Sequence, residues 1–490
     1  MDEFSHAISF LLDDQVVTID FSKPGALRPS TTVLQYLRSL DGHKGVKEGC
    51  AEGDCGACTV VVAGTDGRGG LEYHSLDSCL LFLPMIHGKQ LITVENLAHR
   101  KNGQLILHPV QQAMVETGGS QCGYCTPGIV MSLFALYKNP GNIDNETITD
   151  ALTGNLCRCT GYRPIVVAAA KACSGDRKDH FSENEDDVIA MLFKIQENST
   201  PLELKSENQV YLKPFGLLDA LRLKKMHPDA LIVNGSTDAA LLQTKKKIHI
   251  PKILDISAVN ELKILVEDEN FLAIGSGVAL QEVYNFCQRR FPALAEILKW
   301  FGSLQIRNIA TLGGNIGSAS PIGDTLPVLI ASESRIRLMG SEGSREMLLE
   351  DFITAYRKTA IQQDELITMV IIPKPGGDEI LRTYKISKRR DLDISSVSGC
   401  FRLKLDEEGK VEKVRLVFGG MSEMTKRAGL TEEFLLGKTW NRDIVEKAAE
   451  MIYSAFSPIS DARAEADARR IMAKNLLLKF WTETINPIKS

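Results

Sequence analysis

The hydrophobic and polar positions near the amino terminus predict a small sheet that packs on one helix. Residues 7–21, AISFLLDDQVVTIDF, alternate as two strands around a turn at Asp13–Asp14. A helix is expected to begin near Ser30 or Thr31, since apolar residues then recur on one stripe: Val33, Leu34, Leu37 and Leu40. Another strand is expected over Thr59–Ala63. The pattern predicts an α+β module over residues 1–97.

Residues 98–173 change to a helical pattern and predict a small bundle of four helices. Pro109 and Pro127 stand where helices can begin, because proline is tolerated in the first turn. One wide apolar face follows Pro127, formed by Ile129, Val130, Leu133, Phe134 and Tyr137. Two more helices are expected around 148–152 and 164–170.

Residues 174–205 are rich in charged and small polar residues, which predicts a solvated linker. Its one apolar island, Val188–Ile195, is expected to dock on a domain surface. Beyond it we expect two α+β domains, over residues 206–380 and 381–490. In the second of these, alternating strands from residue 383 precede helices over 441–483.

Eight of the eleven cysteines form two quartets, and their spacing indicates metal-binding chemistry in addition to a fold. The first quartet is Cys50, Cys55, Cys58 and Cys79. Its four–two spacing followed by a distant fourth cysteine is typical of plant-type [2Fe–2S] ligands, which predicts a ferredoxin-like domain of the β-grasp type. The second quartet is Cys122, Cys125, Cys157 and Cys159, in loops at helix ends of the predicted bundle. The partial positive charge of a helix amino terminus suits an anionic cluster there.

Structural zinc is the main alternative for these cysteines, because CxxC pairs also occur in zinc sites. Zinc sites usually combine two similar knuckles, whereas Cys157 and Cys159 are one residue apart and Cys79 stands alone. Disulfides are disfavoured because the amino terminus, MDEFSHAISF, does not have the pattern of a secretory signal. Cys173, Cys287 and Cys400 fit neither quartet, and we assign them no role.

Composition narrows the class of protein. The chain has 57 basic and 62 acidic residues and a net charge of −5, which argues against general nucleic-acid binding. No apolar run is long enough for a membrane span. These features predict a cytoplasmic oxidoreductase without nucleic-acid or membrane partners.

Two loops of small residues predict a flavin dinucleotide site. Residues 231–242, LIVNGSTDAALL, have the pattern of a buried strand, a turn and a helix start, which suits a phosphate group. Residues 305–324, QIRNIATLGGNIGSASPIGD, are dense in glycine but lack the G-x-G-x-x-G spacing. Either loop alone is weak evidence, but both together, downstream of two cysteine quartets, favour FAD.

The motifs CAEGDCGACTV, GSQCGYCTPGIV, GNLCRCTGYRP, the 305–324 segment and YKISKRR resemble the xanthine dehydrogenase branch of the molybdenum hydroxylases. The resemblance runs from residue 7 to about 480. It implies two [2Fe–2S] domains, an FAD domain and a carboxy-terminal α+β domain. Because the sequence ends after the FAD portion, it implies an electron-transfer subunit of a split enzyme. The molybdopterin would then lie on a large partner subunit, in a heterotetramer of two small and two large subunits.

The resemblance also implies cofactor contacts in this chain. For FAD these are Val233, Asn234, Gly235, Ser236, Thr237, Asp238, Phe301, Thr311, Leu312, Gly313, Gly314, Asn315, Asp324, Ile367 and Lys385. Asn234 departs from the family's usual glycine, and a positive φ there would suit asparagine. The loop Lys388–Asp393 is expected beside the flavin, where it influences nicotinamide access. Gln121 is expected to hydrogen-bond the partner's pterin.

The resemblance implies that hypoxanthine or xanthine is hydroxylated at molybdenum on the partner, with no catalytic residue in this chain. Electrons would pass through the bundle cluster, the ferredoxin-like cluster and FAD to NAD⁺. The same subunit role in an N-heterocycle or aldehyde hydroxylase is the alternative. An iron–sulfur sensor without turnover is a third hypothesis, which two clusters plus an FAD domain disfavour.

Overall fold

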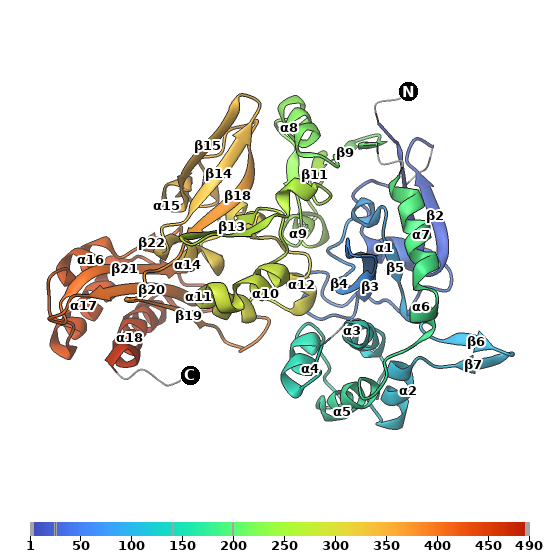
Figure 1. Ribbon diagram of the computed structural model, residues 1–490, viewed down its shortest axis with the longest axis horizontal. Coiled ribbons are helices and arrows are strands. Elements are labelled where there is room, and N and C mark those ends of the chain that lie inside the picture. Colours follow the sequence, from blue (N-terminus) through green and yellow to red (C-terminus); the bar gives the residue numbers. More distant parts are fainter. Residues whose placement is uncertain (1–3, 24, 26, 140, 198–199, 486–490) are drawn as a thin grey trace. The chain divides into compact units, whose positions relative to one another are not determined.

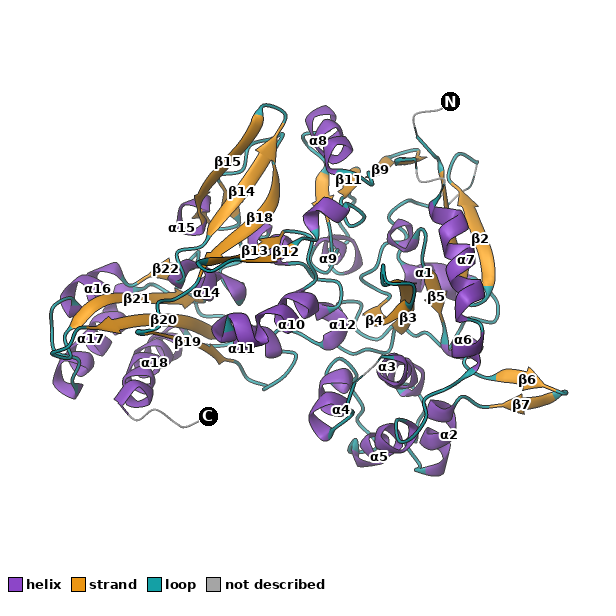
Figure 2. Ribbon diagram, in the orientation of Figure 1, coloured by secondary structure: helices purple, strands orange, loops and turns teal. Residues whose placement is uncertain are grey.

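A computed structural model describes residues 4–23, 25, 27–139, 141–197 and 200–485 (Figures 1 and 2). The chain divides into two compact units. Unit 1 comprises residues 1–259 and 303–310, and unit 2 comprises residues 260–302 and 311–490. This division cuts through the predicted FAD domain, because its residues 206–259 and 303–310 belong to unit 1 and the rest of it to unit 2. The four boundaries that divide the sequence into the five expected segments stay predictions.

Unit 1 begins with the predicted ferredoxin-like fold. Its sheet has the order β2-β1-β5-β3-β4, in which β1 and β5 are parallel and the other neighbours are antiparallel. Helix α1 begins after Thr32, whose side chain and Gln35 form a capping box. The elements are β1 (Ala7–Leu12), β2 (Gln15–Asp20), α1 (Val33–Ser39), β3 (Thr59–Thr65), β4 (Leu71–Asp77), η1 (Leu83–Ile86), β5 (Gln90–Ile92) and η2 (Val94–Asn96). The β-grasp prediction is confirmed.

The helical bundle follows, with the four predicted helices. They are α2 (Pro109–Glu116), α3 (Thr126–Lys138), α4 (Asn145–Leu152) and α5 (Arg163–Ala172). The expectation that residues 98–173 are all helical is wrong at one place, because β6 (His99–Lys101) and β7 (Gln104–Ile106) form a hairpin. Asn102 and Gly103 turn it with φ of 51° and 78°. An Asn–Gly pair between short strands is the signal that could have predicted this hairpin.

The predicted linker is largely folded. It contains α6 (His180–Glu183), α7 (Glu185–Gln196) and the beginning of β8, and so differs from the solvated chain that its charge predicted. Val188 and Leu192 of α7 are buried with Leu11 of β1. The apolar island therefore docks on the ferredoxin-like sheet, because a helix with a buried apolar stripe tolerates charges on its other face.

The rest of unit 1 is a four-stranded sheet of order β10-β11-β9-β8. Its elements are β8 (Leu202–Ser206), β9 (Gln209–Lys213), α8 (Leu217–Met226), β10 (Leu231–Val233), α9 (Ala239–Thr244), β11 (Lys252–Asp255) and α12 (Leu304–Arg307). One hydrophobic core joins this sheet to the ferredoxin-like sheet, since Tyr211, Val233 and Ile253 cluster with Phe10 and Phe82.

Unit 2 holds two larger sheets. The first has the order β12-β13-β18-β14-β15 and the second β19-β20-β21-β22. The elements beside the first sheet are η3 (Asn260–Leu262), β12 (Leu265–Glu267), β13 (Phe271–Gly275), α10 (Leu280–Arg290), α11 (Pro292–Lys299), α13 (Leu312–Gly317), α14 (Thr325–Ala331), β14 (Arg335–Gly340), β15 (Gly343–Leu348), α15 (Leu349–Phe352), β16 (Ile353–Ala355), β17 (Lys358–Thr359) and β18 (Leu366–Pro373). Those of the carboxy-terminal sheet are β19 (Glu379–Ile386), β20 (Val397–Leu405), β21 (Val411–Gly419), β22 (Lys426–Arg427), α16 (Gly429–Leu435), α17 (Arg442–Ala455) and α18 (Ala466–Ile485). The predicted α+β carboxy-terminal domain is confirmed.

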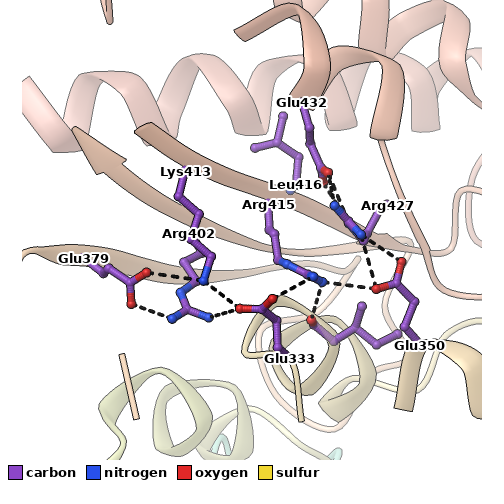
Figure 3. Close-up of polar contacts among 10 residues, drawn as sticks. Glu333, Glu350, Glu379, Arg402, Lys413, Arg415, Leu416, Arg427 and Glu432 are labelled. Atoms are coloured by element: carbon purple, nitrogen blue, oxygen red, sulfur yellow. Dashed lines mark hydrogen bonds and ion pairs between the residues drawn. The ribbon is translucent and has the colours of Figure 1, made fainter. Parts of the chain in front are cut away.

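A chain of alternating charges crosses unit 2 (Figure 3). Arg402 on β20 pairs with Glu379 and Glu333 at 2.5 and 3.0 Å. Arg415 on β21 pairs with Glu333 and Glu350 at 2.9 and 3.1 Å. Arg427 then joins Glu350 to Glu432 on α16, at 3.1 and 2.5 Å. The network ties the carboxy-terminal sheet to α14 and α15, since Glu333 follows α14 and Glu350 lies in α15.

Among the described helices, none combines the length and apolar character required to cross a bilayer.

Candidate iron–sulfur and flavin sites

The first quartet is assembled by the pairing of β3 with β4. Cys58 directly precedes β3 and Cys79 follows β4, and the register places Thr59 opposite Asp77. The Sγ atoms of Cys58 and Cys79 consequently lie 3.4 Å apart in the buried interior. Cys50 and Cys55 form the second pair, through a hydrogen bond between their thiol groups. The four thiols of the first quartet therefore form two pairs.

The local environment favours a thiolate at Cys50. The pKa of Cys50 is lowered to about 5 because the Cys55 thiol and the amides of Glu52 and Asp54 donate to its sulfur. The two amide nitrogens lie 3.4 and 3.2 Å from that sulfur. Backbone donors aimed at sulfur stabilise negative charge on a ligand set. The loop therefore fits an anionic cluster.

The second quartet lies at the ends of three helices of the bundle. Cys125 is the N-cap residue of α3, and Cys157 and Cys159 lie between α4 and α5. The thiols again form pairs, Cys122 with Cys159 and Cys125 with Cys157. The Cys157 amide donates to the Tyr162 hydroxyl at 2.8 Å. Sequence reasoning missed Tyr162, whose role becomes visible only in the folded loop.

Paired thiols suit a two-iron cluster, in which each iron takes two cysteine ligands. Within the described residues, no set of three or more His, Cys, Asp or Glu side chains converges on a point that would hold one metal ion. The three cysteines outside the quartets lie elsewhere, with Cys287 and Cys400 buried and Cys173 partly exposed.

The second quartet faces the surface, unlike Cys58 and Cys79 of the first. Cys122, Cys159 and Gln121 are exposed. Two large side chains beside them are also exposed, Tyr124 at 49% and Leu156 at 44%. Part of the second quartet and these two apolar neighbours are therefore accessible at the surface of this chain.

The first predicted flavin loop follows β10 in unit 1. Val233 is buried, and a Cβ at Gly235 would lie 2.0 Å from the carbonyl oxygen of Ile309. Ser236 has a φ of 59°, and its hydroxyl donates to the carbonyl of Leu80. The positive φ considered for Asn234 thus belongs to Ser236. Thr237 is partly exposed, and Asp238 is exposed at the start of α9.

The second predicted flavin loop lies in unit 2 from Thr311 onward, whereas its residues 305–310 belong to unit 1. Thr311 is the N-cap residue of α13, and its hydroxyl accepts from the Gly314 amide at 3.1 Å. Gly313 is held against β13's end, since a Cβ there would lie 2.7 Å from the carbonyl oxygen of Ser276. Gly314 has more room, because a Cβ there would meet only the Thr311 hydroxyl. Asn315 accepts from Thr325 at 2.6 Å, while Leu312 is buried.

Asp324 and Lys385, predicted separately as flavin contacts, form one buried ion pair. Their charged groups lie 2.7 Å apart, with side-chain exposures of 8% and 5%. Lys385 also donates to the carbonyl of Trp300 at 2.9 Å, and Ser395 donates to Asp324 at 2.5 Å. Phe301 and Ile367 are partly buried in the same unit. Their contacts with a flavin stay predictions.

Four family models match the chain in succession. They describe a 2Fe-2S iron-sulfur cluster binding domain (residues 26–79), a [2Fe-2S] binding domain (93–170), an FAD binding domain in molybdopterin dehydrogenase (203–375) and a CO dehydrogenase flavoprotein C-terminal domain (382–484). The chain therefore has two domains that bind [2Fe–2S] clusters and one that binds FAD.

Curated relatives agree with these models. The chain is 33% identical to xanthine dehydrogenase 1 of Arabidopsis thaliana, over 92% of this chain and 38% of that protein. It is 32% identical to xanthine dehydrogenase/oxidase of Gallus gallus, over 94% and 39%. The chain thus spans well under half the length of these relatives.

Solved structures show the same fold at lower identity. Carbon monoxide dehydrogenase from Hydrogenophaga pseudoflava matches with a TM-score of 0.53 and 22% identity, over 56% of this chain and 96% of that chain. Quinoline 2-oxidoreductase from Pseudomonas putida 86 matches with a TM-score of 0.52 and 22% identity, over 57% and 98%.

Proposed function

This chain is the iron–sulfur and FAD portion of a molybdenum hydroxylase, and from that premise we propose that it is the electron-transfer subunit of a xanthine dehydrogenase. In this proposal purine is hydroxylated at a molybdenum centre on a separate partner subunit. When bound, the clusters carry single electrons, and FAD accepts them singly and releases a hydride to NAD⁺. The residues that we assign to the two clusters and to FAD all belong to this chain.

The observation that carries the proposal is the arrangement of both cysteine quartets as two thiol pairs each. Two redox centres of this kind have no use in a protein that only binds nucleotide. The choice of xanthine as substrate rests on relatives at 32–33% identity that align over most of this chain.

For FAD we assign the predicted contacts loop by loop. Gly235 allows its loop to pack against the backbone of Ile309, whereas the space beside Gly314 holds only the Thr311 hydroxyl. The Asp324–Lys385 pair fixes a cation in a buried position, which suits a polar group of the dinucleotide. The loop Lys388–Asp393 is proposed to influence nicotinamide access.

For the partner we assign the exposed surface around Gln121, Cys122 and Cys159. Electrons from molybdenum would enter at this surface, and Gln121 would donate to the pterin. Its exposed apolar neighbours, Tyr124 and Leu156, would be buried on assembly. We propose a heterotetramer of two small and two large subunits.

The test is co-expression of this chain with its molybdenum subunit, followed by assays with NAD⁺ on hypoxanthine, xanthine, an aldehyde and a quinoline. We expect reduction of NAD⁺ with the two purines. Turnover of the aldehyde or the quinoline without turnover of either purine would instead favour the second candidate, the same subunit role in another molybdenum hydroxylase. The structural similarity to quinoline 2-oxidoreductase is the observation that favours this candidate. Purine hydroxylation by the single chain without a partner would contradict the split arrangement.

A further inference from the structure

The segment QIRN, residues 305–308, lies in the part of the chain that returns to unit 1. Sequence reasoning placed it in the glycine-rich flavin loop. In the fold it belongs to α12 and the residue that follows. Its polar side chains reach into the place where the two iron–sulfur domains meet.

The two cysteine loops touch through their backbones at this place. The amide of Leu156, next to Cys157, donates to the carbonyl oxygen of Cys55 at 3.0 Å. A Cβ at Gly56 would lie 2.2 Å from the carbonyl oxygen of Gly154. A Cβ at Gly128 would lie 2.0 Å from the carbonyl oxygen of Gly56. Any side chain larger than that of glycine at Gly56 or Gly128 would therefore require the backbone of these loops to shift.

The side-chain amide of Asn155 holds this junction. Its Nδ2 donates to the carbonyl oxygen of Gly56 and to the Thr59 hydroxyl, both at 3.2 Å. Its Oδ1 accepts from the Ser132 hydroxyl at 2.6 Å and from Gln305 Nε2 at 3.0 Å. Gln305 Nε2 also donates to the Ser132 hydroxyl at 2.9 Å. Asn155 is 2% exposed and Gln305 is completely buried, so removal of either amide leaves its partners without water to replace it.

The neighbours of Gln305 fasten the same segment to both domains. Arg307 Nη2 lies 2.6 and 2.7 Å from the two carboxylate oxygens of Asp150 on α4. Asn308 donates to the carbonyl oxygen of Ser75 on β4 at 3.1 Å. One short segment therefore binds the helical domain, the ferredoxin-like domain and the junction between them.

We propose that Gln305 is a positioning residue that, through Asn155, fixes the separation and orientation of the two cluster-binding loops. This inference rests on the proposed presence of a cluster in each quartet. Electron transfer between two centres slows steeply as they separate, so a rigid junction protects the rate. Ile309 and Ala310 connect the segment to Thr311, so it also leads along the chain from this junction to the second flavin loop.

The experiment compares Gln305→Met and Ser132→Ala with the control Gln112→Met in the full chain. Gln112 is exposed on α2 and donates to Glu116 on the same helix, so its replacement leaves the junction intact. Iron content is measured first. Low-temperature EPR of the dithionite-reduced proteins then measures the magnetic interaction between the two reduced clusters, which depends on their distance and relative orientation.

We expect both junction variants to keep wild-type iron and to show an altered splitting of the EPR signals, with the control unchanged. Wild-type splitting in both variants at full iron content would overturn the inference. If Gln305→Met loses iron, the test rests on Ser132→Ala, which removes only one hydroxyl. Wild-type EPR splitting in Ser132→Ala at full iron content would then overturn the inference. A wild-type protein without two cluster signals would instead contradict the proposed function itself.

Discussion

Gly314 is the residue at which the flavin assignment can be tested most directly. A Cβ there would lie 2.9 Å from the Thr311 hydroxyl and meet no backbone atom, so Gly314→Leu is expected to fold after a small shift of that side chain. The leucine side chain would then occupy space that the proposal gives to the dinucleotide. We predict loss of most bound FAD with iron content unchanged, measured by flavin release and iron analysis. Gly377→Leu is the control, because Gly377 is exposed and a Cβ there would meet nothing within 4 Å. Full FAD occupancy in Gly314→Leu would contradict the placement.

The two quartets can be separated by single cysteine substitutions. Wild-type protein is expected to hold about four iron atoms and to give two EPR signals when reduced. Cys55→Ser should remove one signal and Cys157→Ser the other, because each replaces one ligand of a different quartet. Cys287→Ser, outside both quartets and buried, is the control. Stoichiometric zinc, or one signal in the wild type, would contradict two clusters.

His87 predicts a pH dependence of stability. Burial and the nearby charge of Lys213 lower its pKa to about 4, and its Nδ1 accepts from the Ser9 amide at 3.0 Å. The unfolded chain binds a proton near pH 6.5, so the stabilisation is complete above that pH and is lost as pH falls toward 4. We expect a loss of about 2 kcal/mol across this window after allowing for partial exposure.

Chemical unfolding of unit 1 at pH 7 and pH 5 measures this effect. His87→Gln should flatten the dependence, while His249→Gln at an exposed position should leave it unchanged. Equal slopes in His87→Gln and wild type would show that another group is responsible.

At the scale of elements, the charge network of Figure 3 predicts how the carboxy-terminal sheet is held. Glu333 pairs with Arg402, Lys413 and Arg415, and these charges lower its pKa despite partial burial. Glu333→Gln should destabilise unit 2 by about 1–2 kcal/mol, because it leaves the buried Arg402 and the largely buried Arg415 with fewer partners. Urea unfolding followed by circular dichroism measures the change.

The control is Glu423→Gln, which breaks an exposed pair with Lys426 and should cost well under 1 kcal/mol. If both variants unfold alike, the network contributes no more than ordinary surface pairs.

At the scale of the whole molecule, the proposal predicts separate activities for the single chain and the complex. The chain expressed alone with FAD should oxidise NADH with an artificial dye, since that exchange requires only the flavin. Gly314→Leu should abolish this activity, and Cys157→Ser should retain it. Dye reduction that depends on Cys157 would show that the dye takes its electrons from the clusters.

Several helices could be predicted from residues that are close together in the sequence. The capping box at Thr32, the prolines that begin α2 and α3, and the apolar face of α3 are properties of neighbouring residues, so their helices could be predicted. The hairpin at 99–106 was missed because its strands are short, although an Asn–Gly pair forms its turn. The helix α7 was missed because the charge of the surrounding segment predicted a linker, although an apolar stripe runs along the helix.

The fold class and two candidate sets of cysteine ligands could be predicted from the sequence, because cysteine spacing and apolar periodicity are properties of short stretches of chain. The pairing of the thiols, the ion pair between Asp324 and Lys385, and the hydrogen bond from Gln305 to Asn155 became visible only in the folded chain. These contacts join residues up to 150 positions apart. Such pairs leave no local pattern, since their proximity depends on strand register and on how separate elements pack.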